Sequence, residues 1–480
     1  MRYSVILRYA GSVMLIVSAF MAISAIISLV SHDAGFYPLL LSSLLTLALG
    51  GFPMLFVPKA DHITTKEGFT IVVGSWIMAC AVGMFPYLIW GGEFTFINAW
   101  FESVSGFTAT GASILTDIEA LPQGLLFWRT ATCWIGGAGV VMFALLILPS
   151  LGTNKMALSS IELSSLAKDN YRYRTQMIVR ILLVVYVGLT IITTLLLKVS
   201  GMRWFDAVNH AMSACATGGF STKNASIGFF DSPLIEGVLL VAMFLSSLHF
   251  GLIYSTFAFK SNNIFRSEVV RTYAGIILFT TLAVALSLRI ADTYPTILES
   301  LRKSLFQVVS LISTTGFATA DTNLWTPFAI VALIIVSIIC GCAGSTAGGI
   351  KVDRVLLYSK VLASRLRAQQ HPNAIIRTRL DGILQDDRHL QATILFLSTY
   401  FILILVGTLS STLFEMDLLT AFSSTVSFIG NVGPGFGKVG SLNNYSEIPA
   451  ILKIQGSVLM LMGRLEIFGF IQFLFIKMWR

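Results

Sequence analysis

Runs of apolar residues long enough to cross a membrane recur from one end of this chain to the other. A helix needs roughly 20 such residues to span a hydrocarbon core about 30 Å thick. Only 12% of the 480 residues are charged, about half the share found in soluble domains. We therefore expect an all-α integral membrane protein with ten crossing segments, the eighth interrupted: residues 10–30, 37–57, 67–90, 125–149, 176–198, 234–259, 269–291, 326–366, 390–414 and 449–476.

Charge places these segments relative to the two sides of the membrane. The first apolar run follows Arg2 and Arg8 but is too long for the apolar part of a signal peptide, so we expect a retained helix. With both termini in the cytoplasm, most of the 32 Lys and Arg residues fall on inner flanks, as the positive-inside rule requires. The net charge of +8 thus reflects topology and predicts no nucleic-acid partner.

A fourfold repeat follows the first two helices. Each copy has a spanning helix, a lead-in segment of about ten residues, a glycine-containing turn and a second apolar helix. Ten helical residues cover about half a membrane, so the lead-in segments are re-entrant, and topology puts all four turns on one side. The anchoring glycines are Gly111, Gly218, Gly316 and Gly433. The expected units are the N-terminal helix pair 1–58 and the repeats 59–151, 152–262, 263–370 and 371–480.

Four parallel glycine turns suit a cation filter. A dehydrated potassium ion needs oxygen ligands, and rings of backbone carbonyls supply them without adding net charge. A single Thr-Gly pair is ordinary turn chemistry, whereas four copies in register favour a pore. The expected filter is Thr108, Ala109, Thr110, Gly111, Cys215, Ala216, Thr217, Gly218, Ser313, Thr314, Thr315, Gly316, Gly430, Asn431, Val432 and Gly433. The expected K⁺ ligands are Thr110, Gly111, Thr217, Gly218, Thr315, Gly316, Val432 and Gly433.

These turns carry a family resemblance that covers the whole chain. The motifs are Phe107-Thr-Ala-Thr-Gly111-Ala, Ala216-Thr-Gly218-Gly-Phe-Ser-Thr, Ser313-Thr-Thr-Gly316-Phe and Gly430-Asn-Val-Gly433-Pro-Gly. They resemble the Trk/Ktr/HKT superfamily of potassium transporters, specifically its bacterial Trk-type pore subunit. The resemblance implies four helix–pore-loop–helix repeats around a pseudo-fourfold pore, with one filter glycine per repeat. A serine in the first turn accompanies sodium permeability in plant members, so Gly111 favours potassium; the fourth turn departs most from the pattern.

The second helix of the third repeat is interrupted by a run of small residues from Cys340 to Gly349. The run lacks the Gly-Lys-Ser/Thr order and the preceding strand of a phosphate-binding loop. A loosely packed kink is the plain alternative, because glycines cause kinks. The resemblance implies an intramembrane gate below the filter, over residues 341–349, with Gly341, Gly344, Ser345, Thr346, Gly348 and Gly349 as its members.

Arg464 is expected near the midplane of the last apolar run, 448–478. An ionisable group at that depth is functional by default and faces a cavity or a partner. The alternative is a structural ion pair, but Glu466, the nearest acid, lies two residues away and on a helix does not face Arg464. The resemblance implies a basic residue below the filter, so we assign Arg464 to the gate.

The cysteines and histidines show no spacing suited to a metal, and we expect no covalently bound cofactor, with K⁺ as the transported ligand. The resemblance implies a homodimer in the bacterial cytoplasmic (inner) membrane. It also implies a separate cytoplasmic ring of nucleotide-binding regulatory subunits, through which ATP, ADP or NAD would act. The basic stretch 351–388 and the loop 152–175 offer docking surface for that ring.

Two other functions compete with a potassium channel-like uptake protein. A proton- or sodium-coupled symporter builds its site from broken helices, and the sequence indicates only one. A membrane-embedded enzyme needs a nucleophile, metal cluster or carboxylate pair inside the bilayer, and no such set is visible, so we predict that the chain is not an enzyme.

Overall fold

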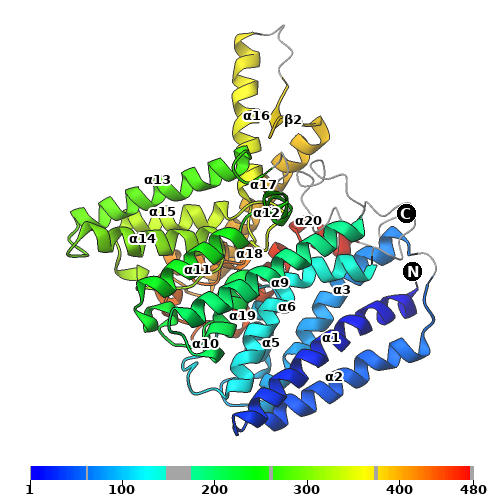
Figure 1. Cartoon of the computed structure of the whole chain (residues 1–480). Coiled ribbons are helices and arrows are strands. Elements are labelled where there is room, and N and C mark those ends of the chain that lie inside the picture. The colour runs from blue at the N-terminus through cyan, green and yellow to red at the C-terminus, as the bar shows by residue number, and fades with distance from the viewer. Residues whose placement is uncertain (1, 61–62, 148–174, 259–262, 372–376, 476–480) are drawn as a thin grey trace.

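The computed structural model describes residues 2–60, 63–147, 175–258, 263–371 and 377–475. It is predominantly helical (Figure 1). The helices α1 (Tyr3–Val30) and α2 (Phe36–Phe56) pack against each other at one edge of the molecule, and α1 also contacts α3 and α6 of the first repeat. One short antiparallel hairpin, β1 (Arg379–Leu380) with β2 (Ile383–Leu384), pairs Arg379 with Leu384 and Leu380 with Ile383.

The four repeats each begin with a long helix, turn back through a short pore helix, and return through a second long helix. The first helices are α3 (Thr65–Gly83) continued by α4 (Phe85–Trp90), α9 (Thr175–Val199), α13 (Glu268–Ile290) and α17 (Asp387–Leu413). The pore helices are α5 (Phe96–Phe107), α10 (Trp204–Ala216), α14 (Ile297–Ile312) and α18 (Leu418–Gly430). The return helices are α6 (Gln123–Ile147), α11 (Pro233–Ser246) with α12 (Phe250–Phe257), α15 (Pro327–Ile339) with α16 (Val352–Gln370), and α19 (Ala450–Arg464) with α20 (Ile467–Leu474).

Side-chain caps fix where most of the pore helices begin. Thr95, Thr296 and Asp417 each accept a hydrogen bond from the backbone N–H three residues later, which satisfies one of the free donors of a helix N-terminus. Short 3₁₀ turns follow the second, third and fourth glycine turns: η2 (Ser226–Phe230), η3 (Thr322–Leu324) and η4 (Gly437–Val439).

The repeats are arranged in a closed circle. Each pore helix packs against the return helix of the preceding repeat: α10 against α6, α14 against α11, and α18 against α15. The circle closes where α5 of the first repeat packs against α19 of the fourth. Four helix–pore-loop–helix repeats therefore surround one axis, as the sequence predicts.

Within the described residues, six helices are long and apolar enough to cross a membrane, or eight if two bent helix pairs each count as one span. Large apolar side chains such as Leu55, Phe279 and Leu413 are exposed on these helices, as lipid contact requires. The chain is a multi-pass membrane protein. The α16 helix projects away from this body beside the hairpin (Figure 1).

Two expected continuous spans are broken. The segment 234–259 bends by 104° after Ser246, and the segment 449–476 bends by 112° after Arg464. At the first break, the Ser247 carbonyl accepts a hydrogen bond from Cys342 N at 2.9 Å instead of continuing the helix. Among the described residues, three of the four return helices are thus bent or interrupted, and the expectation of a single broken helix was wrong.

Candidate functional site

The four turns share one backbone path. After each pore helix comes a non-glycine residue with positive φ (Ala109, Thr217, Thr314 and Asn431), at 51°, 53°, 60° and 53°. The next residue donates its N–H to the carbonyl of a serine five positions earlier: Thr110 to Ser105, Gly218 to Ser213, Thr315 to Ser310 and Val432 to Ser427. A glycine with positive φ then follows: Gly111, Gly219, Gly316 and Gly433, at 82°, 70°, 79° and 101°.

This path corrects the predicted register of the second turn. The structural counterpart of Gly111, Gly316 and Gly433 is Gly219, whereas Gly218 occupies the position of Thr110. The geometry that the four turns share requires a glycine with positive φ at one position. In the second turn two adjacent glycines could occupy that position, so the sequence alone did not distinguish them. With the corrected register, Ser213 is the counterpart of Ser105, Ser310 and Ser427, and all four turns begin at a serine.

The turns meet one another in a ring. A Cβ placed on Gly111 would lie 2.2 Å from the Gly218 carbonyl oxygen, and one on Gly219 would lie 2.0 Å from that of Thr315. A Cβ on Gly316 would lie 2.3 Å from the Val432 oxygen, and one on Gly433 would lie 2.6 Å from the Thr110 oxygen. Each glycine therefore touches a main-chain oxygen of the next repeat, and no side chain fits at any of the four positions.

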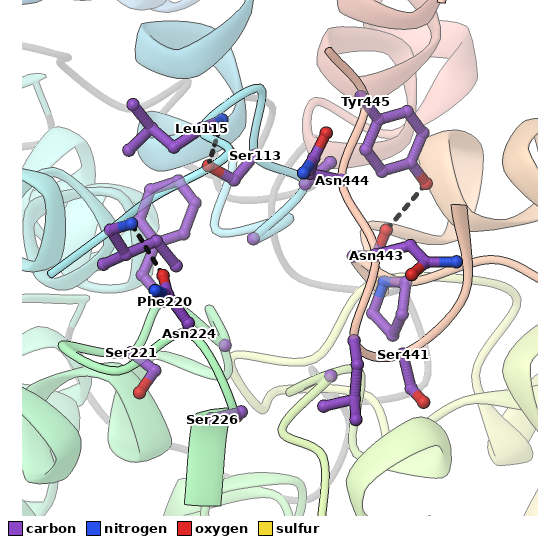
Figure 2. Close-up of a pocket in the computed structure, with 18 of the residues that line it drawn as sticks. Ser113, Leu115, Phe220, Ser221, Asn224, Ser226, Ser441, Asn443, Asn444 and Tyr445 are labelled. Atoms are coloured by element: carbon purple, nitrogen blue, oxygen red, sulfur yellow. Dashed lines mark hydrogen bonds between the residues drawn. The ribbon is translucent and has the colours of Figure 1, made fainter. Parts of the chain in front are cut away.

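The ring forms the floor of an open pocket of about 120 Å³ that all four glycines line. Ser113, Ser221 and Asn224 face Ser441, Asn443 and Tyr445 across this pocket (Figure 2). At its rim, the Asn224 amide donates to Asp117 at 2.8 Å and holds the pKa of that carboxyl below its usual value. Serine hydroxyls and asparagine amides thus line the pocket together with the cationic side chains of Arg129 and Lys223, and the lowered pKa favours the ionised form of the Asp117 carboxyl beside it.

The fourth turn differs from the others in its hydrogen bonds. The Gly433 carbonyl oxygen accepts from Ser427 Oγ at 2.8 Å and from Tyr445 Oη at 2.9 Å, so this predicted ligand is already engaged within the protein. Asn431 Nδ2 donates to Thr110 Oγ1 at 2.9 Å and to the Met460 carbonyl at 3.0 Å, which joins the fourth turn to the first. The oxygens that occupy the same place in all four turns are the main-chain carbonyl oxygens of Thr110, Gly218, Thr315 and Val432, each of which touches the ring glycine of a neighbouring repeat.

The loop 341–349 lies directly against the ends of the pore helices. Thr346 Oγ1 donates to the Cys215 carbonyl at 3.1 Å, and Gly348 N donates to Thr314 Oγ1 at 3.1 Å. A Cβ on Gly348 would lie 2.3 Å from the Gly430 carbonyl oxygen. The loop therefore contacts the second, third and fourth repeats at once.

The other predicted members of this loop shape its path. Gly344 and Gly349 have positive φ, at 75° and 68°, and a Cβ on Gly341 would lie 2.7 Å from the Ala347 Cβ. Ser345 Oγ donates to the Cys342 carbonyl at 2.6 Å, a bond internal to the loop. These residues make the loop compact, and Thr346 and Gly348 attach it to its surroundings.

Arg464 is the last residue of α19, so the expectation that it lies within one continuous helix was wrong. Its Nη1 donates to the Thr346 carbonyl at 2.8 Å, and its Nη2 donates to the Gly136 carbonyl of α6 at 2.7 Å. Glu466 pairs with Arg354. Arg464 thus bridges the loop to the first repeat, beside a cavity of about 30 Å³.

Sequence reasoning missed one buried ion pair next to the ring. Glu102 of α5 and Arg129 of α6 lie 2.9 Å apart, with 0% and 1% of their side chains exposed. An arginine inside the expected span 125–149 was the available signal, because charges at membrane depth have a role by default. Within the described residues, no group of three or more His, Cys, Asp or Glu side chains could hold a metal ion.

Comparisons with known proteins agree with this architecture. The family model TrkH, described as a cation transport protein, matches residues 40–479. The Trk system potassium uptake proteins TrkH of Salmonella typhimurium and of Escherichia coli are each 34% identical to this chain over the whole of both sequences. The crystal structure of the potassium transporter TrkH from Vibrio parahaemolyticus superposes on this chain with a TM-score of 0.90 and is 31% identical in sequence. The superposition covers the whole of both chains.

Proposed function

The chain belongs to the TrkH family of cation transport proteins, which are transporters and not enzymes, and on that premise we propose that it takes up potassium through the ring of glycine turns. The observation that carries the proposal is the closure of the ring. Each glycine touches a main-chain oxygen of the next repeat, so four equivalent carbonyls are brought together at one place. Such a ring can replace the hydration shell of a potassium ion.

Electrostatics at the ring favour a cation without trapping it. The four pore helices end at the ring, and the C-terminal ends of helices carry partial negative charge. The filter residues include no carboxylate, so the attraction comes from dipoles. In this proposal the ligands of the ion are the main-chain carbonyl oxygens of Thr110, Gly218, Thr315 and Val432. Gly433 shapes the turn, but its own carbonyl oxygen does not bind the ion.

The loop 341–349 closes the path below the filter in the proposed mechanism. It contacts the second, third and fourth repeats directly and the first repeat through Arg464, so it occupies the space beneath the ring. Hydrogen bonds from a charged donor are worth about 1.5–3 kcal/mol each. The two from Arg464 stabilise the closed position, and opening requires the loop to leave both Arg464 and Cys215.

Family membership also supports a proposal for the cellular setting. We place the protein in the bacterial cytoplasmic membrane as a homodimer, with both termini in the cytoplasm, and no covalently bound cofactor. A separate nucleotide-binding ring would dock on the projecting α16 and the β1–β2 hairpin. The other proposed docking surface, 152–175, lies outside the described residues apart from its final residue.

Uptake of ⁸⁶Rb⁺ into liposomes holding the purified chain tests this function. Sodium and proton gradients across the liposome membrane are set independently. In the key condition both are absent, and only the potassium gradient drives the uptake of ⁸⁶Rb⁺. We expect uptake that needs no co-ion. Uptake that stops without a proton or sodium gradient would instead support a symporter, a reading favoured by the bent return helices.

A further inference from the structure

The Glu102–Arg129 pair is buried behind the ring and belongs to no part of the proposed filter or gate. Taking two charges out of water is costly, and a buried pair is retained only with good geometry and further hydrogen bonds. Both conditions hold. Glu102 also accepts from Ser113 Oγ at 3.0 Å and from the Ile114 N–H at 3.0 Å.

Arg129 extends these contacts to the second repeat. Its Nη2 donates to Ser113 Oγ at 3.1 Å, and its Nη1 donates to the Ser221 carbonyl at 3.4 Å. Its guanidinium carbon lies 4.2 Å from the centre of the Phe220 ring. Ser113 follows Gly111 by two residues, and Ser221 follows Gly219 by two. The pair therefore holds the segments that leave two neighbouring glycine turns.

All three other repeats place a polar side chain at the same position of the pore helix, and in the second and third repeats it bonds to the segment that leaves the turn. His210 precedes Gly219 by as many residues as Glu102 precedes Gly111, and its Nε2 is hydrogen-bonded to Ser221 Oγ at 2.9 Å. Gln307 has the same position before Gly316, and its Nε2 donates to the Ala320 carbonyl at 3.5 Å. Support of the outgoing segment is thus shared, while the charge pair is specific to the first repeat.

The positive charge of this pair also faces the entrance. Arg129 lines the same pocket as the four ring glycines. An uncompensated guanidinium there would repel an arriving cation, and Glu102 neutralises it at 2.9 Å.

Building on the proposed function, we propose that Glu102 and Arg129 are positioning residues for ion selectivity. They hold the first and second glycine turns at the spacing that potassium requires, and their charges cancel at the pore entrance. Neither residue touches the ion in this account.

Two readouts separate geometry from charge: the K⁺/Na⁺ uptake ratio and the potassium concentration that gives half-maximal uptake. Arg129→Lys keeps the charge but loses the forked contacts to Ser113 and Ser221. We expect the K⁺/Na⁺ ratio to fall about tenfold, the effect of one to two lost hydrogen bonds, with little change in half-maximal concentration. Glu102→Gln leaves Arg129 uncompensated, and we expect the half-maximal concentration to rise.

The double variant Glu102→Gln/Arg129→Gln removes both charges, so its half-maximal concentration should return towards wild type while its K⁺/Na⁺ ratio stays low. It also carries no lone buried charge, which protects the test against misfolding. The matched control is Glu119→Gln/Lys223→Gln, which removes a more exposed pair at the same pocket rim. Both readouts should stay near wild type there.

A wild-type K⁺/Na⁺ ratio in folded Arg129→Lys would overturn the inference while leaving the proposed function intact. Failure of the wild-type chain to take up ⁸⁶Rb⁺ would overturn the proposed function and this inference with it.

Discussion

Arg464 donates a hydrogen bond to the main-chain carbonyl of Thr346, with 2.8 Å between Nη1 and the oxygen. The same guanidinium reaches the Gly136 carbonyl, so one side chain ties the loop 341–349 to the first repeat. The side-chain hydroxyl of Thr346 donates a second hydrogen bond, to the Cys215 carbonyl of the second repeat. The loop is thus attached to the protein on both sides of a single residue.

Replacing Arg464 should open the path. Arg464→Ala removes both bonds to carbonyl oxygens and a positive charge below the ring. We expect uptake of ⁸⁶Rb⁺ into liposomes to rise by at least about tenfold, because each bond contributes about 1.5–3 kcal/mol and about 1.4 kcal/mol corresponds to a factor of ten. Arg367→Ala removes an exposed arginine from the projecting α16 and should leave the rate unchanged. A flat or lower rate in Arg464→Ala protein that still assembles would assign Arg464 a purely structural role.

Thr346 offers an independent test of the loop. Thr346→Val keeps the shape of the side chain but removes the hydroxyl, whose single proton is shared between the Cys215 and Ser246 carbonyl oxygens, each 3.1 Å from Oγ1. We expect a several-fold rise in basal uptake, because one such shared hydrogen bond contributes about 1 kcal/mol. Ser345→Ala loses only a bond inside the loop and should have a smaller effect. Equal effects of the two changes would argue against Thr346 as the attachment point.

Gly111 should control discrimination between potassium and sodium. Gly111 has a φ of 82°, and a Cβ there would lie 2.2 Å from the Gly218 oxygen, so Gly111→Ser must displace a ring carbonyl. The expected result is sodium competition in ⁸⁶Rb⁺ uptake. Gly237→Ser, on α11 with open space around it, is the control. An unchanged K⁺/Na⁺ ratio in Gly111→Ser would contradict the filter assignment.

The second turn allows the corrected register to be tested. A Cβ at Gly219 meets the Thr315 carbonyl oxygen at 2.0 Å, whereas one at Gly218 meets the Cys133 side chain at 2.7 Å. Gly219→Ala should therefore lower the K⁺/Na⁺ uptake ratio. No second substitution that shortens a side chain should restore the ratio, because the added Cβ meets a main-chain oxygen. Gly218→Ala should be rescued by Cys133→Gly, at a cost of about 1 kcal/mol in the stability of α6. The opposite pattern would restore Gly218 as the ring glycine.

The sequence predicted the helical repeats because their signals are long and repeated. Each unit combines a spanning apolar run with a re-entrant segment and a glycine turn, so the repeat is recognisable even where one copy departs from the pattern. It also singled out the loop 341–349 and Arg464, which the structure brings into contact through the Thr346 carbonyl. The comparisons agree with the prediction of the helical repeats, because the chain belongs to the TrkH family over its whole length.

The predictions that were wrong concern features that depend on contacts between segments far apart in the sequence. Neither Ser246–His249 nor Leu465–Glu466 contains the glycine or proline that usually marks a helix break. The first break is stabilised by hydrogen bonds from the loop of the next repeat, which no local pattern encodes. The register of Gly218 and Gly219 likewise became clear only from φ and from the serine carbonyls.

The position of a heavy potassium analogue in the protein tests directly whether the four ring oxygens bind the ion. Crystals of the chain grown with Tl⁺ would be measured by anomalous diffraction, with Na⁺ crystals as the control. The account predicts a peak on the axis between Gly111, Gly219, Gly316 and Gly433, within ligand distance of the Thr110, Gly218, Thr315 and Val432 oxygens. A Tl⁺ peak bound elsewhere, with none inside this ring, would contradict it.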